Sequence, residues 1–262
     1  DGKWSGSSFD SGWRTAALDI SGNVWLASSN SVRKEGSGNG TDLPGFAIKD
    51  TITFILWENE KDLLVGTSNG LLNYNGTWSA ISFTTGKRIN SIIKEMNDLW
   101  VATDDGLLRR IDGKWINTDD NLMAYGLKRT YFALDNGASN SDILFGGLFS
   151  VGCIAKNGDN WLMRGADGLP YGPVKTIKSN SETIWLGTDR GAIKKDKVWH
   201  YYNGKRWLPD NKVNDILPLD EQTVWIATPK GISEIKQVKM TLEEKAEAFE
   251  KRIRERHDRY GL

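Results

Sequence analysis

Short apolar segments separated by tight polar turns run through most of the chain. The stretch from Val213 to Ile235 is typical, because it reads as an apolar strand, an acidic turn, a strand containing Trp225, a glycine turn and a third strand. Short strands joined by such turns predict antiparallel β-structure. A meander of this length cannot bury both of its faces alone, so its core must come from other parts of the chain.

One strand pattern returns six times along the sequence. It consists of two apolar residues around a variable one, followed by two small residues, and it occurs at residues 24–28, 63–67, 99–103, 143–147, 184–188 and 224–228. In four copies the variable position is tryptophan, namely Trp25, Trp100, Trp185 and Trp225. A glycine turn and a further strand, often ending in an aromatic residue, follow most copies.

A self-similar unit of about 40 residues with four short strands is the signature of a β-propeller blade. A blade cannot satisfy its two faces alone, so blades stack face to face around an axis. We expect the repeated tryptophans to pack between blades, because large aromatic side chains mainly contribute core surface.

The two ends of the repeat region predict how the ring closes. The chain begins with DGKW (1–4), and the same four letters end a blade at residues 112–115. We therefore expect the N-terminal strand to complete the last blade, which removes the open sheet edges. The prediction is an all-β, six-bladed propeller over residues 1–237, whereas seven blades would require one that this chain lacks. The innermost strands are expected to begin near Trp13, Ile48, Ile89, Leu127, Val174 and Val213.

Residues 238–262 are predicted to form a separate linker or docking helix. Thr241 and Glu244 have the spacing of a capping box, which marks a helix start. The apolar residues of this segment fall on one helical stripe, namely Leu242, Ala246, Phe249, Ile253 and Tyr260. We expect this amphipathic helix to dock on the propeller or to lead to a further domain. Its charged outer faces argue against membrane insertion.

Composition and charge argue against several classes of protein. The 34 basic and 34 acidic residues cancel, so attraction of the whole molecule to nucleic acid or to anionic membranes is not expected. The single Cys153 cannot form a disulfide within the chain. No apolar run is long enough to predict a membrane span. No phosphate-binding loop and no His/Cys cluster with metal-ligand spacing is found, so neither a cofactor nor a metal is expected.

The segment from Trp199 to Ile235 resembles the two-component regulator propeller repeat. The likeness lies in its LPDNKV linker, its VWIAT strand and its glycine-initiated third strand, and all six units show parts of this pattern. The resemblance implies an extracytoplasmic location, secreted or periplasmic. Members of that family include periplasmic sensor domains of hybrid two-component systems that bind glycan fragments. Some polysaccharide lyases that act on uronic-acid polymers are also propellers.

The expected inner strands predict a ligand site at one mouth of the central channel. Aligning them on their first apolar residue gives a common second position, held by Arg14, Lys49, Asn90, Lys128, Lys175 and Asn214. Four of these residues are cationic and none is acidic, which favours carboxylate, sulfate or phosphate ligands. The competing interpretation is a solvated strand start, partly neutralised by Asp50 and Asp215.

Our first hypothesis is a non-catalytic binding or scaffold propeller of an extracytoplasmic, carbohydrate-associated protein. Its channel mouth would contact an anionic polysaccharide or oligosaccharide, or a partner domain, through the common second position of the inner strands. This position is called the ring position below. Nucleic acid is not an expected partner, because the basic residues are not interleaved with a stripe of aromatic residues.

Two alternative hypotheses belong to other classes. One is a lyase acting on a uronic-acid polymer, which needs a base to remove a proton, and its candidate catalytic residues are Tyr131 and His200. Tyr131 is expected on an inner strand and His200 on an outer strand, and a structural role competes with catalysis for both. The other alternative is a purely structural module that positions a C-terminal partner domain through the helix stripe.

Overall fold

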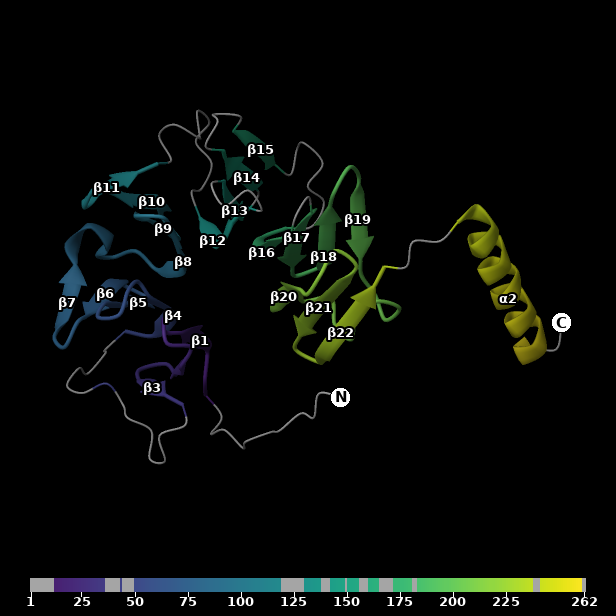
Figure 1. The fold of residues 1–262 in the computed structure, drawn as a ribbon, viewed down its shortest axis with the longest axis horizontal. Helices are drawn as coiled ribbons and strands as arrows, with labels where there is room; N and C mark the ends of the chain where they lie inside the picture. The colour runs from purple at the N-terminus through teal and green to yellow at the C-terminus, as the bar shows by residue number, and fades with distance from the viewer. Residues whose placement is uncertain are drawn as a thin grey trace.

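The computed structural model describes ten segments of the chain, namely residues 12–35, 43, 50–118, 130–137, 142–148, 150–155, 160–164, 172–180, 183–237 and 241–260. The strands of this part form six antiparallel sheets that follow one another around a ring (Figure 1). This arrangement confirms the six-bladed β-propeller and its repeated blade.

The first three sheets run in chain order around the ring. The first contains β1 (Thr15–Leu18), β2 (Val24–Ala27) and β3 (Val32–Lys34). The second contains β4 (Ile52–Trp57), β5 (Leu63–Thr67), β6 (Gly70–Tyr74) and β7 (Trp78–Ile81), and the short 3₁₀ helix η1 (Ser82–Thr84) follows it. The third contains β8 (Ile89–Glu95), β9 (Asp98–Thr103), β10 (Gly106–Ile111) and β11 (Lys114–Asn117).

The remaining three sheets repeat the same meander. The fourth contains β12 (Tyr131–Asn136), β13 (Ile143–Gly147), β14 (Ser150–Ile154) and β15 (Trp161–Arg164). The fifth contains β16 (Val174–Asn180), β17 (Thr183–Thr188), β18 (Gly191–Lys195) and β19 (Trp199–Tyr202). The sixth contains β20 (Asp215–Pro218), β21 (Thr223–Thr228) and β22 (Gly231–Lys236).

The hydrophobic core lies in layers between neighbouring blades. Leu64 and Leu71 of the second sheet pack with Ile89 and Ile92 of the third, and a comparable cluster fills each of the junctions from the first sheet to the sixth. Each inner strand from β1 to β16 also contacts the inner strand of the next sheet. The core of the segment from Val213 to Ile235 is therefore completed by the fifth sheet, as the repeat pattern predicts.

Four inner strands contain a bulge directly after their first residue. In β8 the register shifts between Ile89 and Ser91, and the same shift occurs in β4, β12 and β16. An extra residue at this point brings side chains three positions apart to the same face. Ile89 and Ile92 are accordingly both fully buried.

This register corrects two of the expected strand starts. The inner strands of the second and fourth sheets begin at Ile52 and Tyr131, not at Ile48 and Leu127. A bulged strand needs a second apolar residue three positions after the first. Counting from Ile48 or Leu127 leads to a threonine, whereas Ile52 and Tyr131 have Ile55 and Leu134 in the required place.

Glycines of the second strands let adjacent blades approach closely. A Cβ atom at Gly66 would lie 2.6 Å from the Cγ2 atom of Ile89, and one at Gly187 would lie 2.7 Å from the Cγ1 atom of Val213. These distances are shorter than ordinary contact, so the next blade occupies the space that a side chain would need. The small residue of the repeated strand pattern is thus a packing requirement at these junctions.

The predictions for the two ends of the chain have different outcomes. The expected closing strand at residues 1–4 lies outside the described residues, and the sixth sheet has three described strands. The helix α2 (Leu242–Tyr260) begins with the predicted capping box: the Thr241 N–H donates to Glu244 Oε2 at 2.7 Å and the Glu244 N–H to Thr241 Oγ1 at 3.2 Å.

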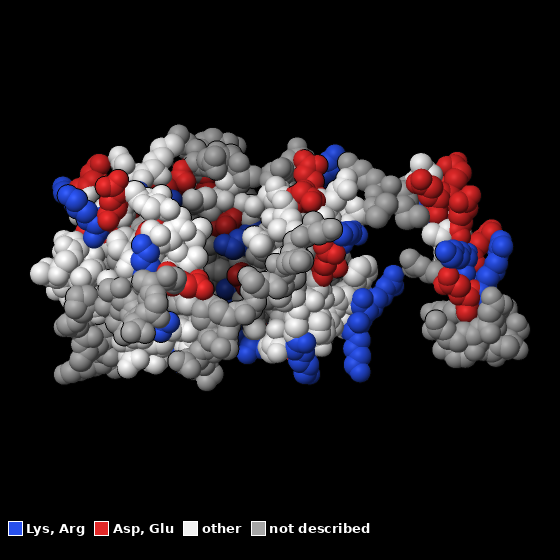
Figure 2. Space-filling model, turned by 60° about the horizontal axis from the view of Figure 1, so that its bottom comes forward, with Lys and Arg blue, Asp and Glu red and all other residues white. Residues whose placement is uncertain are grey.

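The predicted stripe of α2 faces solvent in this structure. Leu242 and Phe249 are 81% and 66% exposed, and α2 stands apart from the ring in two views (Figures 1 and 2). The role of residues 238–262 as a linker or a docking helix stays a prediction. Within the described residues, no helix combines the length and apolar character that crossing a membrane requires.

Candidate functional site

The structure tests which residues share the ring position near the channel mouth. By register, the equivalent position is held by Arg14, Thr53, Asn90, Phe132, Lys175 and Asn214, of which Arg14 and Asn214 directly precede β1 and β20. Four of the predicted residues therefore occupy equivalent places. Lys49 and Lys128 lie outside the described residues, and the corrected strand starts put Thr53 and Phe132 at the position that they were expected to hold.

Two of the residues at this position tie neighbouring blades together. Thr53 Oγ1 donates a hydrogen bond of 2.5 Å to the backbone oxygen of Ile89, the first residue of the next inner strand. Asn90 Nδ2 makes the same kind of bond, at 2.7 Å, to the backbone oxygen of Tyr131. The side chain of Asn90 is therefore engaged in a link between blades.

Three lysines on this face have acidic partners. Lys175 Nζ lies 2.7 Å from Asp189 Oδ1, Lys230 Nζ lies 3.1 Å from Asp210 Oδ2, and Lys87 forms an ion pair with Asp105. Figure 2 shows basic and acidic side chains together in the central hollow. The described part of this face is consequently mixed in charge.

The candidate catalytic residues of the lyase hypothesis lie in different surroundings. Tyr131 is only 1% exposed, and its ring packs edge-on against Phe145 with 5.5 Å between centroids. His200 lies on the outer strand of the fifth sheet, with Nε2 at 3.3 Å from the carboxylate of Asp196. Tyr131 belongs to the fourth sheet, so the structure does not bring the two residues to one site.

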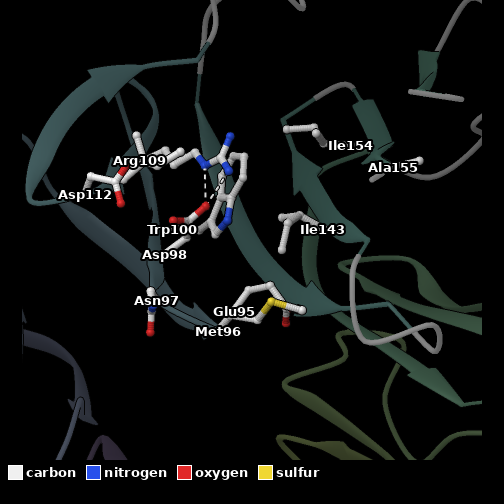
Figure 3. Close-up of a pocket in the computed structure, with 11 residues that line it drawn as sticks. Glu95, Met96, Asn97, Asp98, Trp100, Arg109, Asp112, Ile143, Ile154 and Ala155 are labelled. Atoms are coloured by element: carbon white, nitrogen blue, oxygen red, sulfur yellow. Dashed lines mark hydrogen bonds and ion pairs between the residues drawn. The ribbon is translucent and has the colours of Figure 1, made fainter. Parts of the chain in front are cut away.

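A cleft of about 480 Å³ opens between the third and fourth sheets, at the end of the channel opposite the ring position (Figure 3). The third sheet contributes Glu95, Met96, Asn97, Asp98, Trp100, Arg109, Ile111 and Asp112. The fourth sheet and the residue after β14 contribute Ile143, Ile154 and Ala155. The cleft therefore has one polar wall and one apolar wall.

Arg109 is fixed in the polar wall by two neighbours. Its Nε donates to Asp98 Oδ2 at 2.8 Å, and a terminal nitrogen of the guanidinium pairs with the same oxygen atom. The guanidinium also lies 4.8 Å from the ring centroid of Trp100, within cation–π range. Trp100 is only 3% exposed, so the covered ring does not offer a stacking surface to a ligand.

A second cleft, of about 620 Å³, lies on the other side of the third sheet. Arg110 occupies it, forms an ion pair with Glu58 of the second sheet and lies 5.8 Å from the ring centroid of Trp115. Asn97 and Asp112 line both clefts. The two clefts thus share lining residues at the end of the third sheet.

Sequence reasoning missed these clefts, although a signal was present. The tryptophan of the repeated second strand pairs across the sheet with a polar residue of the third strand, as in Trp25–Lys34, Trp100–Arg109, Trp185–Lys194 and Trp225–Glu234. Lys194 lies over the ring of Trp185 as Arg109 lies over Trp100. Reading the strands in pairs would have placed a charged residue beside each of these tryptophans.

One carboxyl group has a raised pKa, and its surroundings explain it structurally. Burial raises the pKa of Asp135 above its ordinary value. The Ser179 N–H and hydroxyl each donate to Asp135 Oδ2 at 2.7 Å, and Lys178 Nζ lies 3.7 Å from the other oxygen. Asp135 therefore joins the fourth and fifth sheets. The described residues contain no group of three or more potential metal ligands.

Comparison with known proteins shows the fold. No family model and no curated protein matches the sequence. The extracellular domain of a putative hybrid two-component system from B. thetaiotaomicron superposes with a TM-score of 0.70 at 16% identity, over 85% of this chain and 32% of that one. The chain thus spans about a third of that neighbour's length.

Two further neighbours show how widely the fold is shared. The extracellular domain of a putative one-component system from B. thetaiotaomicron matches with a TM-score of 0.52 at 16% identity, over 86% of this chain and 38% of that one. Virginiamycin B lyase from Staphylococcus aureus matches with a TM-score of 0.64 at 14% identity, over 88% of this chain and 85% of that one. An extracellular domain of a putative two-component system and a lyase both resemble this chain, so its function must be argued from its own residues.

Proposed function

We propose that this chain is a non-catalytic binding propeller of an extracytoplasmic protein, and that its channel mouth contacts an anionic glycan. The supporting observation is the ring position. After the register is corrected, this position still contains two cations, Arg14 and Lys175, and no acidic residue. The side chains of Arg14 and Asn214 are exposed there, so a carboxylate or sulfate has access to charge and to hydrogen-bond donors.

The structural neighbours support the binding role and the location. Two of them are extracellular domains of regulatory systems. The lyase alternative has weaker support, because the core position of Tyr131 and the outer-strand position of His200 do not form an acid–base pair. Membership of the two-component regulator propeller family, suggested by the sequence, remains part of this proposal.

Affinity electrophoresis tests the proposal. The purified chain is run through gels that contain polygalacturonate or alginate, and through gels that contain a neutral polysaccharide. Retardation by the acidic polymers alone, with the polymers left intact, is the expected result. Free migration in every gel would overturn glycan binding, and cleavage of the polymer would replace it with the lyase.

Matched charge reversals locate the site. The double variant Arg14→Glu, Lys175→Glu should migrate freely through acidic gels, because it places two negative charges at the ring position. Lys251→Glu on the exposed surface of α2 changes charge away from the ring and should be retarded like the wild type. Equal retardation of the double variant would overturn the assignment of the site.

A further inference from the structure

We propose that the end of the third sheet is a docking groove for a basic peptide segment of a partner protein. The third-sheet groove is defined here as the two clefts beside this sheet together with Asn97 and Asp112, which line both. Its preferred occupant is an extended segment in which Lys or Arg alternates with apolar residues.

The third-sheet groove is separate from the channel mouth. Strand β8 runs from Ile89, beside the ring position, to Glu95, which lines the groove. Seven residues of extended strand place these ends about 20 Å apart. A ligand at the ring position therefore leaves the groove free, and each site can be tested without the other.

The shared lining makes the groove long enough for a peptide. The two clefts have volumes of about 480 and 620 Å³ and share Asn97 and Asp112 as lining residues. Either volume alone suits a small ligand. Because the clefts lie on opposite sides of one blade, a ligand that fills both must cross the end of the sheet, and an extended chain has that shape.

The charge of the groove favours a basic occupant. Five carboxylates line it, against two guanidinium groups. Arg109 pairs with Asp98 and Arg110 pairs with Glu58, so both guanidinium groups have partners. Glu95 and Asp112 remain without an ion pair among the described residues. Asp62 accepts hydrogen bonds from Asn59 and Asn73 and is stabilised by the charge of Arg110. The net negative charge of the lining favours cationic side chains and repels an acidic glycan.

Apolar walls provide the second half of the recognition. Ile143 and Ile154 form one wall of the first cleft, and Ile81 and Leu64 belong to the wall of the second. Met96 stands at the rim and is 68% exposed (Figure 3). A flexible thioether side chain adapts to different apolar partners, which suits a peptide-binding rim.

The backbone at Met96 is an independent sign of function. Glu95 and Asp98 pair directly, so Met96 and Asn97 alone form the hairpin turn. Met96 has a φ of 52°, in the left-handed region that glycine, asparagine and aspartate prefer. Strain of this kind is concentrated at binding sites, and here it holds an exposed apolar side chain over the cleft.

The aromatic residues of the groove favour a peptide over a sugar chain. Sugar rings need an open aromatic face, but Arg109 covers that of Trp100. Trp115 stacks on Phe83, with 6.0 Å between the ring centroids, and also lies next to Arg110. Neither ring is left as an open platform. Carboxylates and the half-buried Ile81 and Ile154 remain accessible to Lys and Val side chains, whereas Leu64 and Ile143 are buried behind them.

The test uses three fluorescein-labelled peptides of one design. The probe is acetyl-Gly-Lys-Val-Lys-Val-Lys-Gly-amide, and its partners have Gln or Glu in place of each Lys. Fluorescence anisotropy with the full chain should show binding of the Lys peptide at least tenfold tighter than of the Gln peptide, with no binding of the Glu peptide. Equal binding of the Lys and Gln peptides would overturn the proposal.

Variants assign the binding to the groove. Asn97 is an exposed turn residue that lines both clefts. Asn97→Arg places a cation there and should weaken binding of the Lys peptide at least tenfold. The double variant Glu95→Gln, Asp112→Asn keeps the shape of the groove and should have a similar effect. Glu221→Gln, an exposed carboxylate of the sixth sheet, is the control and should bind like the wild type. Unchanged affinity in Asn97→Arg would overturn the site.

Discussion

The guanidinium of Arg109 lies over the ring of Trp100, 4.8 Å from its centroid, while the two residues face each other on adjacent strands. The same guanidinium pairs with Asp98 at the start of β9. One side chain therefore covers the tryptophan, neutralises a carboxylate and forms the polar wall of a cleft. The contribution of Arg109 to stability can be measured without any ligand.

Arg109→Ala should lower the free energy of unfolding by about 1–2 kcal/mol, because it removes a cation–π contact and leaves the half-buried Asp98 unpaired. Urea unfolding followed by tryptophan fluorescence measures the change. Arg254→Ala is the control, since the Arg254–Glu250 pair on α2 is exposed and should contribute less than about 0.5 kcal/mol. Equal effects of the two variants would contradict the role given to Arg109.

Met96→Gly should raise the free energy of unfolding by about 1 kcal/mol, because glycine adopts a positive φ without the Cβ clash. Thermal unfolding measures the gain. Asn97→Gly is the matched variant in the same turn and should be neutral or destabilising, since Asn97 has no positive φ to relieve. Destabilisation by Met96→Gly would show that the turn is not strained.

Gly187→Ala should destabilise the protein by about 1–3 kcal/mol, because the new methyl group would lie too close to Thr176 of the same sheet and to Val213 of the next blade. Denaturant unfolding of the two single variants, Gly187→Ala and Ala102→Gly, measures the two changes in stability. Ala102 holds the equivalent place in the third sheet, and Ala102→Gly should cost only about 0.5–1 kcal/mol through backbone freedom and lost packing. A smaller cost for Gly187→Ala than for Ala102→Gly would contradict the close approach of the blades.

Asp19 should titrate well below an ordinary aspartate. The hydrogen bond from Trp25 Nε1, at 3.0 Å, is the main cause that lowers its pKa from 3.8 to about 2, and bonds from Asn23 add to it. Trp25→Phe removes the indole donor, so the pKa of Asp19 should rise toward 3.8. Carboxyl carbon shifts in an NMR titration measure this directly.

The same group gives a signed dependence of stability on pH. The pKa of Asp19 is lower in the folded state, so its contribution is present above pH 3.8 and is lost as the pH falls through about 2. The part of the stability difference between wild type and Trp25→Phe that comes from Asp19 should shrink over that interval. Trp185→Phe, which leaves Asp19 untouched, is the control. An unchanged Asp19 pKa in Trp25→Phe would contradict the assignment.

The sequence predicted the fold well because the blade is a local unit. The second strand of each blade is recognisable alone, and the capping box of α2 depends on Thr241 and Glu244 only. The inner strands were harder, since a bulge changes the spacing of buried residues from two to three. The pairs Ile52/Ile55 and Tyr131/Leu134 contained the necessary information, but an alignment on the first apolar residue alone did not use it.

The candidate sites were predicted less well, because they depend on which blades face each other. Tyr131 is buried, and its ring packs against Phe145 of the neighbouring strand in the fourth sheet. The partners of Lys175 and Lys87 lie on turns that are separated from them in sequence. The clefts beside the third sheet need the walls of two neighbouring blades, which no single repeat contains.

The turns between second and third strands have one internal design. Thr67, Thr103, Thr188 and Thr228 each donate from Oγ1 to the backbone oxygen of a glycine three residues on, at 2.7–2.8 Å. Each hydroxyl also accepts from the N–H two residues on. These bonds use the backbone of the middle residues and the threonine side chain, so the side chains of the two middle residues take no part in closing the turn.

Those two residues are Ser68-Asn69, Asp104-Asp105, Asp189-Arg190 and Pro229-Lys230 in the four turns. Their chemistry ranges from amide to double carboxylate to cation on one unchanged scaffold. Substitution at these two positions can therefore change the charge of this face while the threonine–glycine hydrogen bonds of the turn are kept. The four turns therefore share one backbone structure and differ in the side chains that they present. In a propeller of this design, substitutions at these turns offer a route to new ligand preferences.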